Sequence, residues 1–414
     1  MMIRSFFAIL LFVAIAWCIS ENRRGFPVRT VVAGLGIQVG LALVLLKFPL
    51  FTSVFEFLNR AVLALQEATG KGSAFVFGYL GGGDFPFEIK DPQATFILAF
   101  QALPLVLVIS ALSSLLFYWR ILPRVVKGFS WLLEKTMRLG GAEGLGISAN
   151  IFVGMVEAPL LIRPYISKMS RSEIFTLMTS GMATIAGTVM VVYAGILQDI
   201  IPNVMGHILT ASILSAPAAV VISKIMVPGT DEGLTGAELK APQQAYGSMD
   251  AITRGALQGM ELLLNIIAMI IVLVALVSLV NLMLGVLPVI RGEPLTLQRI
   301  LGWLLSPVVW IMGIPWSEAH AAGSLLGTKT VLNELIAYVE MSNLPAGSLS
   351  SKSLLIMSYA LCGFANPGSL GIMIGGLGGI APERRGEIVS LGFRSIVAGT
   401  IAACMTATLA GIMG

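Results

Sequence analysis

Long apolar runs alternate with short polar segments along almost the whole chain. A run of about 20 apolar residues is long enough to cross the roughly 30 Å hydrocarbon core of a bilayer as an α-helix. The first run lacks a small-residue cleavage site, so it is expected to remain as an uncleaved helix. The pattern predicts eight spans, near residues 2–20, 29–48, 93–119, 171–198, 204–227, 257–289, 353–380 and 386–412.

Two further apolar stretches, about 141–167 and 297–338, are interrupted near the middle by glycine, proline and acidic residues. Broken backbone is tolerated at membrane depth only where it is buried in protein or lines a cavity. Both stretches are therefore expected to be re-entrant helical hairpins. Because each is followed by two spans and the two enter from opposite sides, the order predicts an inverted repeat.

Shorter amphipathic segments, 51–67 and 121–138, predict helices that lie in the membrane interface. The polar stretch from Gly229 to Asp250 predicts a cytoplasmic linker between the two halves of the repeat. The expected fold is an all-α polytopic membrane protein with eight transmembrane helices, two hairpins and interfacial helices.

Composition agrees with this class, because 56% of the residues are hydrophobic and only 12% are charged, against roughly 25% charged in an average soluble domain. The net charge of +4 comes from basic residues beside apolar segments, which indicates membrane topology and argues against nucleic acid as a partner. Arg23, Arg24 and Arg29 place the first loop in the cytoplasm, so both termini are expected outside.

Two carboxylates, Glu157 and Glu334, lie in apolar sequence within the predicted hairpins. Charged groups at membrane depth are costly and mark functional sites by default. Glu318 competes with Glu334, but the neighbouring proline and tryptophan favour a structural place for Glu318, at a helix N-terminus at the hairpin tip. The segment from Cys362 to Ser369 adds amide and hydroxyl groups, so the sequence predicts a polar pocket for a hydroxylated solute.

Oxygen ligands for a hard cation are expected near the first hairpin tip. Gly154 permits a turn there, which would free carbonyl groups around Asn150 and Val153. Thr184 lies at a Gly-rich interruption of the next span, where spacing alone favours helix packing over ion binding. Isolated histidines and cysteines offer no metal-ligand spacing or nucleophile–base pair, so an intramembrane enzyme is only a remote alternative.

Four separated motifs and a tail resemble those of the concentrative nucleoside transporters, over nearly the whole chain. They are GMVEAPL from Gly154, GIPWSEA from Gly313, GTKTVLNEL from Gly327, CGFAN from Cys362 and APERRG from Ala381. The resemblance implies sodium-coupled symport of nucleosides such as uridine, cytidine or adenosine, with proton coupling as the alternative. It also implies a homotrimer in a bacterial inner membrane, with a sodium ion co-transported.

The resemblance further implies a mobile transport domain held by a scaffold. On this basis, scaffold helices and interfacial helices occupy 1–138, a first transport repeat 139–228, a linker with an interfacial helix 229–255, a sixth scaffold helix 256–290 and a second transport repeat 291–414.

By motif position, the base would contact Glu157 and Val189, and Phe364 would lie beside the nucleoside. The ribose hydroxyls would be held by Glu334, Asn366 and Ser369, and sodium by Asn150, Val153, Thr184 and Ile185. The chain departs from many relatives at Met155 and Val156, where glutamine and a hydroxyl residue would read a base edge, and at Pro367-Gly368, beside the ribose residues. Because Met155 and Val156 offer no such groups, base discrimination should differ.

Overall fold

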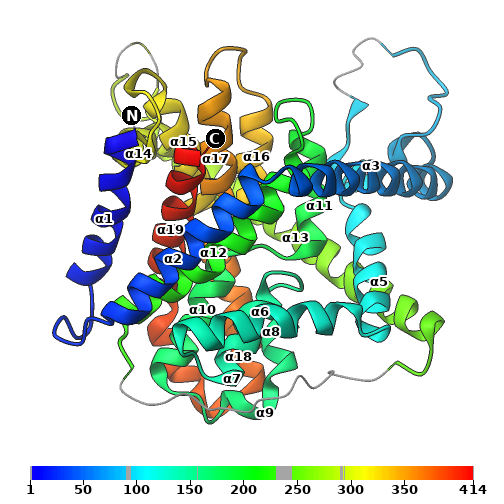
Figure 1. Ribbon diagram of the computed structural model, residues 1–414. Helices are drawn as coiled ribbons and strands as arrows, with labels where there is room; N and C mark the ends of the chain where they lie inside the picture. The colour runs from blue at the N-terminus through cyan, green and yellow to red at the C-terminus, as the bar shows by residue number, and fades with distance from the viewer. Residues whose placement is uncertain are drawn as a thin grey trace.

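The computed structural model describes residues 2–89, 95–155, 157–229, 245–289, 292 and 294–413, and within these ranges the regular structure is helical (Figure 1). Val156 and most of the predicted linker lie outside the described residues. The all-α prediction is confirmed.

Each predicted span falls on one helix or on two consecutive helices. These are α1 Met2–Cys18, α2 Val28–Lys47, α4 Leu98–Gln101 with α5 Leu105–Tyr118, α10 Arg171–Ala183 with α11 Gly187–Leu197, α12 Val204–Met226, α13 Ser248–Leu284, α17 Ser351–Leu361 with α18 Pro367–Ile380, and α19 Arg385–Met413. In the described ranges, six helical segments are long and apolar enough to cross a membrane, or up to seven if a bent pair forms one span. The chain therefore has enough long apolar helices to cross a membrane several times.

Two long helices run across the direction of α17 and α19 at opposite ends of the molecule (Figure 1). One is α3, Pro49–Phe77, followed by the short η1, Gly78–Gly81, and the other is α6, Ile121–Met137. Helix α3 therefore extends beyond the amphipathic segment, 51–67, from which it was predicted. The end that carries α3 also carries both chain termini, so the two termini lie on the same side of the molecule.

The first hairpin consists of α7 Gly141–Asn150, α8 Glu157–Leu161 and α9 Arg163–Ile166. At its tip, Gly154 has φ +105°, a conformation that glycine adopts without strain. The predicted turn is therefore found at the predicted glycine.

The second hairpin is shorter than the predicted 297–338 stretch. It consists of α15 Trp316–Val331 and α16 Glu334–Ser342, with its tip at Leu332 and Asn333. Residues 297–312 form a separate helix, α14, which meets α15 at a bend of 116°. Gly313, at φ +121°, makes this bend, so the stretch holds two breaks where the sequence pattern predicts one.

The same order of elements occurs twice: a hairpin, a broken helix and a continuous helix. The first copy is α7 to α12, and the second is α15 to α19, where the short η3 Pro382–Arg384 precedes α19. Figure 1 shows α7 and α9 at one end of the molecule and α15 and α16 at the other. This arrangement agrees with the predicted inversion.

Helix α13 lies apart from the deeply buried α12 and packs along α5. Gly255 and Gly259 bring the two backbones together, because a Cβ on either would lie within 3 Å of α5 atoms. The helix begins at Ser248, nine residues before the apolar span predicted at 257–289. The polar residues at the start of α13 hid its beginning from a search for apolar runs.

Candidate functional site

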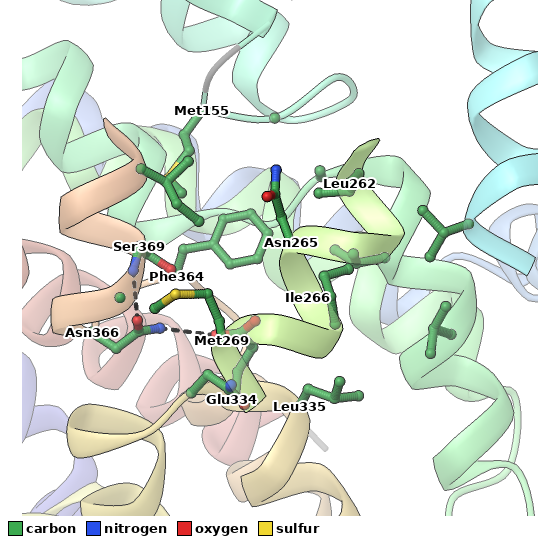
Figure 2. Close-up of a pocket in the computed structure, with 18 of the residues that line it drawn as sticks. Met155, Leu262, Asn265, Ile266, Met269, Glu334, Leu335, Phe364, Asn366 and Ser369 are labelled. Atoms are coloured by element: carbon green, nitrogen blue, oxygen red, sulfur yellow. Dashed lines mark hydrogen bonds between the residues drawn. The ribbon is translucent and has the colours of Figure 1, made fainter. Parts of the chain in front are cut away.

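A cavity of about 130 Å³ lies where both hairpin tips, both helix breaks and α13 meet (Figure 2). Seven of the eight predicted substrate residues line it, and the eighth, Val156, is not described. The seven are Met155, Glu157, Val189, Glu334, Phe364, Asn366 and Ser369. Residues that are up to 214 positions apart in sequence therefore share one cavity wall.

Two side chains hold Glu334 at this cavity. Its Oε1 accepts a hydrogen bond from the Tyr193 hydroxyl at 2.6 Å, and its Oε2 accepts one from Asn366 Nδ2 at 3.1 Å. The residue is 5% exposed and begins α16, where the helix dipole favours a negative charge. Because a carboxylate has about four acceptor positions, Glu334 retains capacity for hydroxyl donors of a ligand.

Asn366 fixes the break between α17 and α18. Its Oδ1 accepts from the Ser369 backbone N–H at 2.8 Å, which caps α18. Pro367 occupies the first turn after the cap, where its missing N–H is not needed. Gly368 lies close to Met269 of α13. Pro367 and Gly368, where this chain differs from many relatives, thus begin a regular helix. Asn366 still points at Glu334.

The opposite part of the cavity is formed by the first repeat. Glu157 begins α8 and is exposed to the cavity, whereas Met155 and Val189 are nearly buried apolar side chains. Figure 2 shows Met155 on one side of Phe364, with Glu334 and Asn366 on the other. The cavity therefore has a polar end in the second repeat and a more apolar end at Met155.

A second cluster, made of oxygen-bearing groups, lies behind the first hairpin tip. In the orientation that pairs both ends of its amide, Asn150 donates to Gly154 O at 2.9 Å and accepts from Gly181 N at 3.3 Å. The Thr184 hydroxyl lies 3.5 Å from the Asn150 carbonyl oxygen. Asn150, Thr184 and Ile185 are buried, and Val153 belongs to the same tip.

This donor set fits a hard monovalent cation. In the described part of the chain no group of three or more histidine, cysteine, aspartate or glutamate residues could hold a metal ion. Neutral carbonyl, amide and hydroxyl oxygens remain, at the C-terminal ends of α7 and α10, where the helix dipoles are negative. The buried Ser180 hydroxyl, one turn before Thr184, has no hydrogen-bond partner among the described residues.

The two helix breaks touch each other at Gly363. This residue has φ +141°, and a Cβ on it would lie 2.8 Å from Met182 O and 2.9 Å from Ala183 O. Only glycine allows the break after α17 to approach the end of α10 so closely. The substrate cavity and the oxygen cluster are consequently joined through backbone contact.

Comparison with known proteins decides the family. Models described as the Na+ dependent nucleoside transporter C-terminus, the Na+ dependent nucleoside transporter N-terminus and nucleoside recognition match residues 207–411, 7–80 and 99–199. A nucleoside permease, NupC, of Helicobacter pylori is 35% identical, covering 96% of this chain and 94% of its own. A putative nucleoside permease, NupX, of Escherichia coli is 33% identical, covering 99% and 98%. The chain belongs to the concentrative nucleoside transporter family.

Solved structures of a related transporter, CNTnw, share the fold. Its inward-facing substrate-bound state gives a TM-score of 0.90 at 33% identity, covering 100% of this chain and 98% of that chain. An outward-facing state gives 0.87 at 33% identity, covering 100% and 97%. This chain is therefore a multi-pass membrane transporter of nucleosides and not an enzyme, and its family includes members seen in alternating-access states.

Sequence reasoning missed two polar groups of this transporter's cavity. Tyr193 follows Val189 by one helical turn, and this spacing could have placed both on the same face. Asn265 is an amide within the apolar run of α13, and Figure 2 shows it facing Phe364. Glu318, by contrast, lies in the first turn of a helix as expected, but that turn of α15 follows the Gly313 bend and is not the hairpin tip; its carboxylate accepts from the Ser350 N–H at 3.0 Å.

Proposed function

We propose that this transporter moves nucleosides into the cell together with sodium. The observation that carries the proposal is the fixed carboxylate of Glu334, which Tyr193 and Asn366 hold at the polar end of the cavity. A ribose offers vicinal hydroxyl donors, and a carboxylate that is already oriented binds them without reorganisation. Glu334, Asn366 and Ser369 are therefore assigned to the ribose.

The base is assigned to the first-repeat end of the same cavity. Glu157 would accept from donor groups on the base edge, Val189 would contact its face, and Phe364 would lie against the nucleoside. Met155 lines this end without offering a hydrogen bond, and Val156 is kept as a base contact on motif position alone. The chemistry of this end favours a partly apolar heterocycle.

Sodium is assigned to the oxygen cluster of Asn150, Val153, Thr184 and Ile185. The Gly187 N–H donates to Phe152 O at 3.0 Å, so the first hairpin tip and the helix break between α10 and α11 are in direct contact. A cation between them would hold both in the substrate-binding arrangement. Sodium would thus increase nucleoside affinity, which is the basis of coupling.

The larger-scale proposal is an elevator-like movement in a homotrimer. Residues 139–228 and 291–414 would form the moving transport repeats, while 1–138 and 256–290 would form the scaffold and 229–255 the link between them. Helix α13 supports this division because most of its apolar surface is exposed in the isolated chain, as a subunit or lipid contact requires. The membrane is proposed to be a bacterial inner membrane, with both termini outside.

Uptake into proteoliposomes tests this function. Labelled uridine, cytidine, adenosine and guanosine are supplied with sodium or with choline in its place, and pH is varied independently. Sodium-dependent, pH-insensitive accumulation is expected. Accumulation that follows a proton gradient in choline would replace sodium with proton coupling, and absence of uptake for all four solutes would overturn the proposed substrates.

A further inference from the structure

Lys329 is a fully buried lysine in the second hairpin, with 0% of its surface exposed. It lies two residues before the end of α15, and its Nζ donates to the carbonyl oxygen of Ala360 at 3.4 Å. Among the described residues, no other acceptor within hydrogen-bond distance is seen for this ammonium group, and it does not line the nucleoside cavity. An ammonium in such a place is costly unless negative charge compensates it.

The compensation comes from helix ends. Ala360 is the penultimate residue of α17, so its carbonyl has no acceptor role inside that helix. Ser358 O, in the same final turn, accepts from the Tyr338 hydroxyl of α16 at 2.8 Å. The negative ends of α15 and α17 therefore converge on Lys329, and Glu334 adds a negative charge that interacts with it.

The repeat gives this lysine a counterpart. Helix α7 packs on α10 in the first repeat as α15 packs on α17 in the second. In the first repeat the C-terminal ends of these helices meet at Asn150 and Thr184, where sodium is assigned. In the second repeat the corresponding ends meet at Lys329 and Ala360.

We propose that the Lys329 ammonium is a tethered cation, which joins the ends of α15 and α17 as the sodium ion joins those of α7 and α10. The inference rests on the proposed sodium site. A covalently attached cation is always present, so the second hairpin and Glu334 stay positioned without sodium. Sodium then controls the first hairpin alone. Lys329 is accordingly a positioning residue for the ribose half of the site.

The substitution Lys329→Asn would convert the second repeat to the residue type of the first. Equilibrium binding of labelled uridine to purified protein is measured against sodium concentration. Relative to the parent, Lys329→Asn should bind at least tenfold more weakly and show a steeper dependence on sodium, because a second ion must now fill the second repeat. Lys329→Arg should retain the parent's curve, and Lys352→Asn, at the exposed start of α17, is the matched control.

If Lys329→Asn binds uridine with the parent's affinity and the parent's dependence on sodium concentration, the proposal is overturned. A parent that binds uridine equally well in sodium and choline would instead overturn the sodium assignment, which separates the two failures.

A second measurement keeps Lys329 intact and so does not depend on the folding of its variants. Phe152→Cys at the first tip and Val331→Cys at the second are labelled with a maleimide, in a Cys18→Ser background because Cys18 is the exposed native thiol. Sodium without nucleoside should slow labelling at Phe152→Cys severalfold and leave Val331→Cys unchanged. Equal protection of both tips would contradict the proposal.

Discussion

The Tyr193 hydroxyl donates a 2.6 Å hydrogen bond to Glu334 Oε1, and this contact joins α11 of the first repeat to α16 of the second. The ring of Tyr193 also lies against that of Tyr338, with centroids 5.0 Å apart. Tyr193 and Glu334 line the nucleoside cavity, and Tyr338 packs beside Tyr193. The two repeats are therefore connected at the site itself, through the broken helix of the first repeat and the second hairpin.

Tyr193→Phe should weaken uridine binding about tenfold, because a hydrogen bond to a charged group contributes roughly 1.5–3 kcal/mol. The ring packing remains, so the melting temperature should change little. Tyr338→Phe is the comparison, since that hydroxyl donates to Ser358 O and the residue does not line the cavity. Binding by titration calorimetry and melting in detergent distinguish the two. Undiminished affinity in Tyr193→Phe would show that Asn366 alone orients the carboxylate.

Glu334→Gln should reduce ribonucleoside affinity roughly ten- to hundredfold, because it replaces a charged acceptor with a neutral amide. It also places an amide group where Asn366 Nδ2 now donates. Glu318→Gln is the matched variant, because Glu318 binds the start of α17 at Ser350 and lies outside the cavity lining. If Glu318→Gln loses uridine binding and Glu334→Gln retains it, the ribose assignment is wrong.

Asn150→Leu should make uptake weak and insensitive to sodium. The change removes an oxygen group from a 1% exposed position and adds apolar volume of similar size. Uptake by proteoliposomes in sodium and in choline measures the effect, and size-exclusion chromatography checks that the assembly is intact. Sodium activation equal to that of the parent would remove Asn150 from the ion site.

The sequence singled out Glu334 and Glu157 because intramembrane charge is costly and therefore informative. Glu334 and Glu157 lie at helix starts that line the cavity, as a functional assignment requires. Tyr193 was missed for the converse reason: tyrosine in an apolar helix is not costly, and periodicity along one helix does not reveal which distant element lies opposite. Its significance depends on a contact with a residue 141 positions away.

The helix boundaries show a similar limit. Gly313 and the Leu332–Asn333 tip are two breaks, separated by the regular helix α15, within one apolar stretch. Apolarity alone cannot tell a hairpin tip from a bend that begins a hairpin. The start of α13 was missed because residues there are polar although helical.

Glu21 lies in the loop between α1 and α2, outside the membrane-spanning segments, and its ion pairs offer a pH test. The Arg171 guanidinium, hydrogen-bonded to Glu21 at 2.9 Å, lowers the pKa of that carboxyl below its ordinary value of 4.5, and Arg394 also contacts it. Because the folded-state pKa is lowered, the stabilisation is present above pH 4.5 and is lost as pH falls through the folded value. Exposed pairs contribute at most about 1 kcal/mol.

Glu21→Gln should therefore lower the melting temperature slightly at pH 7, with the difference from the parent shrinking in acid. Glu67→Gln, which removes a fully exposed pair with Lys71, is the control and should have no measurable effect. Melting curves in detergent between neutral and acidic pH record both. A Glu21→Gln deficit that persists unchanged in acid would assign the effect to packing and not to charge.

Base selectivity should be governed by Met155 and Asn265, which lie on facing walls of the cavity (Figure 2). Met155→Gln places a hydrogen-bonding amide where the parent has an apolar side chain, and should shift relative affinities among uridine, cytidine, adenosine and guanosine by about 1–3 kcal/mol. Asn265→Leu should compress the parent's differences, since it removes an amide from the opposite wall. Both variants should keep their dependence on the ribose hydroxyls, because Glu334 and Asn366 are untouched. Competition by each nucleoside against labelled uridine measures the ranking. An unchanged ranking in both variants would show that Glu157 selects the base without a contribution from Met155 or Asn265.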